Sequence, residues 1–107
     1  MPFEVLLSED AERDIEDIYH YVAHHDAVEN ANGLVAALEE ACSALSDLPE
    51  RGNVPRELLP LGMTEFREVH SKPYRVIYRI TGRKVIIYCV VDGRQDMQSL
   101  LQRRIIR

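Results

Sequence analysis

The sequence predicts an α+β fold in which an N-terminal strand and a helical hairpin pack on an antiparallel β-sheet, followed by a short C-terminal helix. Two observations carry this prediction. Apolar residues recur at helical spacing over most of residues 9–48. Two runs of β-branched and aromatic residues, 74–80 and 85–91, then follow with a short Gly-containing turn between them, which is the pattern of a β-hairpin.

The N-terminal part is predicted to hold a strand and a first helix. Residues 3–7 form a short apolar run that is typical of a strand. Apolar residues then recur every three or four positions over residues 9–24, which predicts an amphipathic helix with an acidic outer face. Ser8 or Asp10 can cap this helix, because a side-chain oxygen at that position accepts a bond from an orphan backbone N–H.

A second helix is expected close behind the first. Asp26 followed by Glu29 has the spacing of a capping box, which places the helix start near Ala27. One apolar stripe then continues until Pro49, which cannot extend a helix. Since only a few residues join the two helices, we expect an antiparallel hairpin whose apolar stripes face a shared sheet.

The second half of the chain is predicted to supply the sheet. Residues 49–63 are rich in Pro and Gly and indicate an ordered loop. Three strands follow, near residues 64–71, 74–81 and 85–91, and their short links can only join antiparallel neighbours. Residues 97–107 suit a short terminal helix.

Composition limits the class of protein. The 107 residues are expected to form one domain spanning 1–107, and 46% hydrophobic with 29% charged residues is ordinary for a folded protein. No signal peptide and no apolar run of spanning length is present, so we expect a cytoplasmic protein without a membrane partner.

The net charge of −5 is unevenly distributed. Residues 1–48 contain twelve acidic residues and one basic residue, whereas residues 49–107 contain six acidic and twelve basic residues. An acidic helical half and a basic sheet half suggest different partners for different faces. The alternative is that the two halves simply complement each other where they pack.

Cysteine and histidine do not indicate a metal site. Cys42 and Cys89 lie among apolar residues without C-x-x-C spacing, so we expect buried free thiols. His20 and His24 are four apart on the first helix, but the segment HYVAH lacks the Glu of the zinc motif and no third ligand is evident. They are expected to be surface histidines, and no metal or cofactor is predicted.

Arginines provide the candidate binding residues. Arg67, Arg75 and Arg79 have the same parity on neighbouring predicted strands, so in a favourable register they would form a basic strip on one sheet face, with Arg94 at its end. Such a strip could bind phosphates or an acidic peptide segment. The alternative is that these arginines pair with Glu65, with Glu68 or with the acidic helices.

The order of four segments resembles the RelE/ParE superfamily of toxins from type II toxin-antitoxin modules. These segments are SEDAERDIEDIYHYVA, LPERGNVPREL, FREVHSKPYRVIYRI and DGRQDMQSLLQRR, which together span nearly the whole chain. Within the superfamily, the chain is most similar to the ParE branch of plasmid stabilisation toxins. The resemblance implies a RelE/ParE-like fold.

The resemblance also implies a function. ParE-type toxins bind DNA gyrase, stabilise its cleaved-DNA state and block replication, and a cognate ParD-like antitoxin holds them inactive in a hetero-oligomer. The chain is then a binding protein and not an enzyme, without sequence-specific nucleic acid binding of its own. Many ParE relatives have a His where this chain has Asp92 and an Arg where it has Gln95, which leaves open whether gyrase activity is retained.

RNA-cleaving RelE relatives provide the main alternative. They use a basic residue on the penultimate strand, an Arg just after the last strand and usually a Tyr near the C-terminus. Arg75 matches the first of these, but Gln95 and Leu101 stand where the Arg and the Tyr are expected. The chain thus resembles the scaffold without the nuclease apparatus. A ribosome-dependent mRNA endoribonuclease is the second candidate function, and an inert antitoxin-binding relative is the third.

Two hypotheses about binding follow. The antitoxin is expected to bind as an amphipathic helix that lies across the helical hairpin and reaches the basic sheet face. Reversing the charge of Arg75 and Arg79 is therefore expected to weaken the complex. Toxicity is expected to depend on residues 92–107, with Arg103 and Arg104 replaceable by Ala without loss of the fold. The residues predicted to contact the antitoxin or gyrase are Arg67, Arg75, Arg79, Arg94, Gln95, Arg103 and Arg104.

Overall fold

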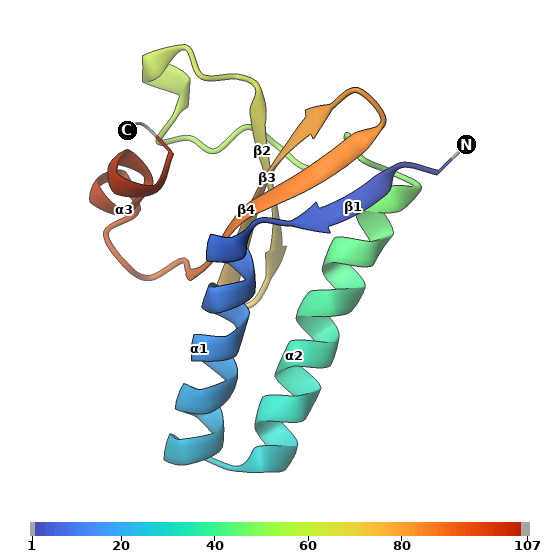
Figure 1. The fold of residues 1–107 in the computed structure, drawn as a ribbon. Coiled ribbons are helices and arrows are strands. Elements are labelled where there is room, and N and C mark those ends of the chain that lie inside the picture. The colour runs from blue at the N-terminus through green and yellow to red at the C-terminus, as the bar shows by residue number, and fades with distance from the viewer. Residues whose placement is uncertain (1, 106–107) are drawn as a thin grey trace.

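The computed structural model describes residues 2–105 and confirms the predicted α+β architecture (Figure 1). A hairpin of two long helices packs on one face of a four-stranded sheet, and a short helix lies on the other face. The elements are β1 (Glu4–Leu7), α1 (Glu9–His25), α2 (Val28–Ser43), β2 (Phe66–Ser71), β3 (Tyr74–Thr81), β4 (Lys84–Asp92) and α3 (Met97–Arg104).

The sheet is mixed rather than purely antiparallel. Its strand order is β1-β4-β3-β2, and β2, β3 and β4 pair antiparallel as predicted. The N-terminal strand joins the sheet itself and pairs parallel to β4, with Val5 opposite Val85. Parallel neighbours need a long crossover, and here the whole chain from α1 to β3 lies between the two strands.

One predicted helix cap is correct and the other is wrong. Ser8 caps α1, since its Oγ accepts a 3.1 Å bond from the Ala11 N–H. Asp26 does not cap α2, which begins at Val28 after Ala27 without any side-chain cap. Asp26 instead closes α1 through its own N–H and accepts a bond from Asn30 Nδ2 at 2.8 Å. Because only Asp26 and Ala27 join the helices and Asp26 ends α1, the N-cap position of α2 falls to Ala27, whose side chain cannot accept a hydrogen bond.

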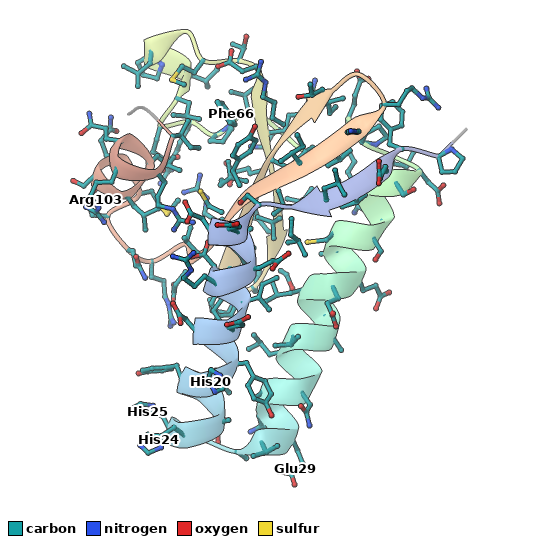
Figure 2. The ribbon with its side chains drawn as sticks, in the orientation of Figure 1. His20, His24, His25, Glu29, Phe66 and Arg103 are labelled. Carbon is teal, nitrogen blue, oxygen red and sulfur yellow. The ribbon has the colours of Figure 1, made fainter. Side chains whose placement is uncertain are left out.

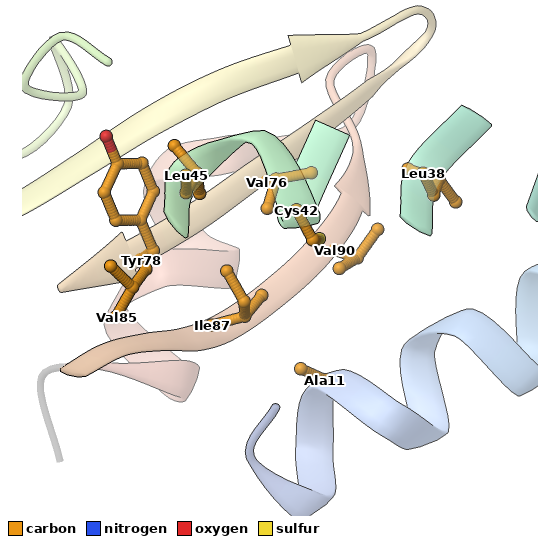
Figure 3. Packing of buried hydrophobic residues seen from close by; sticks show 9 residues of the cluster. All are labelled: Ala11, Leu38, Cys42, Leu45, Val76, Tyr78, Val85, Ile87 and Val90. Carbon is orange, nitrogen blue, oxygen red and sulfur yellow. The ribbon is translucent and has the colours of Figure 1, made fainter. Parts of the chain in front are cut away.

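The core on the helical face fills the space between α1, α2 and the sheet. Its buried side chains meet where the alternating residues of β3 and β4 point toward the helices (Figure 3). Cys42 is one of them, and burial raises the pKa of its thiol to about 11, as expected of an unreactive free cysteine. The cluster comprises Ala11, Leu38, Cys42, Leu45, Val76, Tyr78, Val85, Ile87 and Val90.

A second core lies on the opposite face and holds α3 and the loop of residues 49–63. Its buried members are Leu58, Phe66, Ile77, Cys89, Val91, Met97, Leu100 and Leu101. A β-bulge contributes to it: Ile77 pairs with Cys89, whereas its neighbour Tyr78 pairs with Ile87. The extra residue, Tyr88, packs against this α3-side core next to Cys89.

The loop of residues 49–63 is fixed to the sheet at its start. Tyr78 is fully buried, and its hydroxyl donates to the Pro49 carbonyl at 2.7 Å and accepts from the Gly52 N–H at 3.1 Å. A Cβ at Gly52 would lie 2.5 Å from the Glu68 carbonyl oxygen, so only glycine fits here. This anchoring lets the following loop residues reach the α3 side of the sheet, where Glu57 contacts Arg75 of β3.

The described residues contain no metal site of the kind considered from the sequence. His20 and His24 lie on the exposed surface of α1, away from the sheet (Figure 2). Among residues 2–105 there is no group of three His, Cys, Asp or Glu side chains arranged to hold a metal ion. No helix in the same part of the chain is long and apolar enough to cross a membrane.

Candidate partner-binding surface

The predicted basic strip does not include Arg67. In the β2–β3 register Arg67 lies opposite Tyr78, whereas Arg75 lies opposite His70. Directly paired residues share a face, so Arg67 points to the helical side and Arg75 to the α3 side. Equal parity in sequence was not enough, because the turn at Lys72-Pro73 sets a register that places Arg67 and Arg75 on opposite faces. Arg67 instead donates to the carbonyl oxygens of Glu50 and Gly52, at 3.2 and 2.8 Å, and fastens the loop.

Arg75 is enclosed by two carboxylates. Its Nε and Nη2 donate to Glu68 at 2.6 and 2.9 Å, and its Nη1 and Nη2 donate to Glu57 at 3.0 and 2.8 Å. All three side chains are largely buried: Arg75 is 11% exposed, Glu68 is 4% exposed and Glu57 is 12% exposed. Pairing with Glu68, the alternative considered from the sequence, is what the structure contains, and Glu57 completes the network.

Two carboxylates share one guanidinium at the centre of this network. Hydrogen bonds from Arg75 lower the pKa of Glu57 to about 2, and the pKa of Arg75 is raised in turn by its bonds to Glu57. His70 is more exposed, and its Nε2 lies 2.9 Å from Glu68 Oε1, the oxygen that also accepts from Arg75 Nε. The one positive charge of Arg75 is therefore matched by two negative charges, and Arg75 does not form an open basic surface.

Arg79 remains on the surface of the α3 face. It is exposed, and its guanidinium lies 6.0 Å from the centre of the Phe66 ring, the partner residue in β2. Contact with an aromatic ring is a common way to hold an arginine in place without neutralising it. Of the three strand arginines predicted to form a strip, Arg79 is the one positioned to meet a partner.

Arg94 and Gln95 follow β4 on an exposed turn. Arg94 donates to both carboxylate oxygens of Asp92, at 2.9 and 2.6 Å, and these bonds lower the pKa of Asp92. Gln95 is exposed and its backbone N–H donates to the Asp92 carbonyl. Both residues are accessible, as their predicted binding role requires.

Arg103 and Arg104 have different surroundings. Arg104 is 21% exposed and reaches back to α1, where it binds both oxygens of Asp14 at 3.1 and 2.8 Å. Asp14 also accepts the Val90 N–H at 2.9 Å, so this carboxylate joins α1, β4 and α3. Arg103 is exposed and lies on the outer side of α3 (Figure 2). Ile106 and Arg107, which belong to the predicted C-terminal segment, lie outside the described residues.

A large hollow runs along α1. It has a volume of about 860 Å³ and is bounded by α1, the beginning of β3, the end of β4 and α3. We refer to it as the α1 groove. Its apolar lining comprises Ile18, Tyr21, Val22, Leu34, Pro73, Tyr74, Val90, Val91 and Leu100, and its polar lining comprises Asp14, Asp17, His25, Asp26, Asp92, Arg94, Gln95 and Arg104.

Tyr21 is the prominent apolar feature of this groove. Its side chain is 64% exposed, and its ring stacks on His25 with 4.1 Å between the ring centres. Tyr74 also lines the groove. The pKa of its hydroxyl is raised, mainly by burial and secondly by the charge of Asp92. An exposed aromatic ring held by stacking is typical of a residue that anchors a partner.

Comparison with known proteins identifies the family. The sequence profile described as the ParE toxin of type II toxin-antitoxin system, parDE, matches residues 5–97. The chain belongs to the ParE toxin family. Toxin ParE3 from Caulobacter vibrioides is 28% identical over 91 residues, which cover 85% of this chain and 87% of that protein. The protein is thus a toxin component of a type II toxin-antitoxin system within the RelE/ParE superfamily.

Solved structures share the ParE fold described above. The chromosomal ParDE system from P. aeruginosa contains a chain with a TM-score of 0.70 at 17% identity, covering 84% of this chain and 95% of its own length. The toxin-antitoxin complex RelBE2 from Mycobacterium tuberculosis gives 0.62 at 23% identity, covering 89% and 95%. A mutant of the E. coli toxin RelE in the free state gives 0.64 at 13% identity, covering 94% and 93%.

Some features of this ParE-family chain were not predicted from its sequence. Glu57 lies in a loop that carries no periodic signal, so nothing in the sequence connects it to Arg75. The acidic residues of the first helix are predicted to form its outer face, yet Asp14 of this helix binds Arg104. Leu101, the residue at the expected Tyr position of RNA-cleaving relatives, is 1% exposed and belongs to the α3-side core.

Proposed function

We propose that this ParE-family toxin acts by inhibiting DNA gyrase, is not a nuclease, and is neutralised by a ParD-like antitoxin. Family membership supports the proposal, as does the similarity to Toxin ParE3. The observation that carries it is the state of Arg75. A guanidinium already bound by two carboxylates cannot provide the cationic stabilisation that phosphodiester cleavage requires.

Two further positions support a non-enzymatic toxin. The exposed amide of Gln95 carries no charge to stabilise a phosphorane-like transition state. Leu101 is buried and has no group that transfers a proton. At these two positions the chain therefore offers neither the cation nor the proton-transferring group that RNA-cleaving relatives use.

The purified toxin is expected to increase gyrase-dependent DNA cleavage and to leave mRNA intact. The first measurement is the amount of linear DNA that gyrase produces from a supercoiled plasmid with and without toxin. The second maps cuts in mRNA by primer extension in a translation extract. Loss of one charge-stabilising donor typically slows such catalysis about a hundredfold or more, so no codon-specific cuts are expected. Codon-specific cuts without gyrase-dependent cleavage would favour the RelE-type endoribonuclease, and neither activity would favour an inert antitoxin-binding relative.

The α1 groove is the surface that best suits the antitoxin. The groove-lining residues of α1 run from Asp14 to Asp26, which is about 18 Å at the rise of an α-helix and matches a partner helix of about twelve residues. The floor is apolar, and Asp17 and Asp26 add negative charge at the side of α1. An amphipathic helix with an apolar face and basic flanks fits these features, and an extended tail could continue to Arg79 on the α3 face.

Replacement of Tyr21 by Ala is expected to weaken antitoxin binding about tenfold or more, because an exposed aromatic anchor is lost from the lining of the groove. Leu61→Ala is the matched control, since Leu61 is 49% exposed but does not line the groove. Affinity is measured by titration calorimetry with the purified antitoxin. Equal affinities of the Y21A and L61A variants would place the antitoxin elsewhere.

A further inference from the structure

Beside Arg75 lies a pocket whose charge differs from that of the rest of this acidic protein. It has a volume of about 450 Å³ and is lined on its open side by Arg56, His70, Lys72 and Arg94, with Arg75 and Glu68 at its base. Arg56 is 89% exposed and Arg94 is 77% exposed. The rim therefore gathers three accessible cations, Arg56, Lys72 and Arg94, the last of them paired with Asp92, in a chain whose net charge is −5.

Glu57 occupies the side of Arg75 that an anion would use. Its two carboxylate oxygens accept from Nη1 and Nη2 at 3.0 and 2.8 Å, which is the two-pronged geometry by which arginine binds carboxylate or phosphate. Glu68 binds the other edge of the guanidinium, where its carboxylate accepts hydrogen bonds from Nε and Nη2. Four of the five N–H donors of Arg75 are thus used within the chain, and the fork of Nη1 and Nη2 is closed by Glu57.

The loop holds Glu57 in this position. The next residue, Leu58, is 1% exposed in the α3-side core, and Gly52 and Asn53 fasten the start of the loop to Tyr78 and Glu68. Arg56 lies 3.6 Å from Glu57, so the carboxylate stands between a rim cation and Arg75. An internal anion fixed in this way competes with any free anion as an intramolecular ligand, at an effective concentration set by the loop that holds it.

We propose that Arg75 and the surrounding cations form a phosphate-binding site that is occupied from within by Glu57. In the native chain Glu57 excludes phosphate groups from the sheet. When the carboxylate of Glu57 is removed, Nη1 and Nη2 of Arg75 become accessible from the side of Arg56 and the rim cations, and they bind phosphate. Glu57 is accordingly the residue that sets the specificity of this face, and the inference does not depend on whether gyrase is the target.

The test compares two acidic residues of the same loop. Glu57→Ala and Glu50→Ala change the net charge equally, but Glu50 is exposed and its carboxylate does not touch Arg75. Binding of inorganic phosphate is measured by titration calorimetry, and binding of a labelled six-nucleotide single-stranded RNA by fluorescence anisotropy. Native folding of each variant is checked by circular dichroism, and Glu57→Gln preserves the side-chain shape if the alanine variant does not fold.

We expect the E57A variant to bind phosphate at least tenfold more tightly than the native chain and the E50A variant, with a smaller gain for E57Q. A parallel gain with RNA identifies phosphodiesters as ligands, and a gain with phosphate alone restricts the site to free phosphate. The proposal is overturned if folded E57A and E57Q bind phosphate no better than E50A does, or if the native chain already binds as tightly as E57A.

Discussion

Replacement of Arg75 by Met should lower the free energy of unfolding by about 3–5 kcal/mol, because it leaves two buried carboxylates without their cation. Glu68 is 3% exposed as a residue, and Glu57 is almost as enclosed. Domains of this size are commonly stable by about 5–15 kcal/mol, so the loss is a large share of the total. The measurement is equilibrium unfolding in urea at neutral pH.

A matched control separates the ion pairs from the general effect of losing an arginine. Arg79→Met removes the same charge from the same strand, but Arg79 is exposed and contacts the Phe66 ring without a carboxylate partner in the structure described here. Its effect should stay within about 0.5 kcal/mol, as for other surface substitutions. Similar losses in R75M and R79M would show that the network contributes little.

The same network makes a prediction about pH. Bonds from Arg75 lower the pKa of Glu57 from 4.5 to about 2 in the folded protein. A carboxyl group with a lowered pKa stabilises the fold above its unfolded pKa, and this contribution is lost as the pH falls. The difference in unfolding free energy between the native chain and R75M should therefore shrink between about pH 4.5 and pH 2. A difference independent of pH would contradict the assigned ion pair.

Local sequence patterns predicted the elements of this fold well, for a physical reason. Helical and strand periodicities report which side of each element is buried, and burial is the main force that forms the core. The pairing of β1 with β4 is different, since it joins residues about eighty positions apart and leaves no local trace. The cap at Asp26 failed for a related reason, because a two-residue connection made the same position end α1.

The candidate site was harder to predict, because it depends on register and on partners distant in sequence. The face of a strand residue is set by its parity and by the register of the hairpin, and parity alone grouped Arg67 with Arg75. The pairing of Arg75 with Glu68 was among the alternatives that the sequence left open, since strand neighbours lie close by construction. Glu57 and Asp14 reach their arginines only through the folded loop and the packing of α3 on α1.

Arg103 and Arg104 are expected to separate toxicity from stability, although they were first considered interchangeable. Arg104→Ala breaks two bonds to Asp14 and should lower the free energy of unfolding by about 1.5–3 kcal/mol. Arg103 is exposed on the outer side of α3, so Arg103→Ala should leave unfolding nearly unchanged. Thermal unfolding measures the first effect, and growth inhibition on induction measures toxicity.

If the C-terminal segment contacts gyrase, as we propose, Arg103→Ala should relieve growth inhibition while antitoxin affinity stays unchanged. An exposed arginine at the edge of an interface contributes mainly through the rate of association, so relief should be partial, and the difference between R103A and the native chain in a gyrase assay should shrink as the salt concentration is raised. Arg104→Ala should reduce toxicity only as far as it reduces the folded fraction, because Asp14 holds its guanidinium against α1, in the α1 groove rather than on the outer surface of α3. The opposite result would be full toxicity of R103A together with a stable but non-toxic R104A. It would mean that the contact between α3 and α1 supports binding to the target, and that the outer surface of α3 does not.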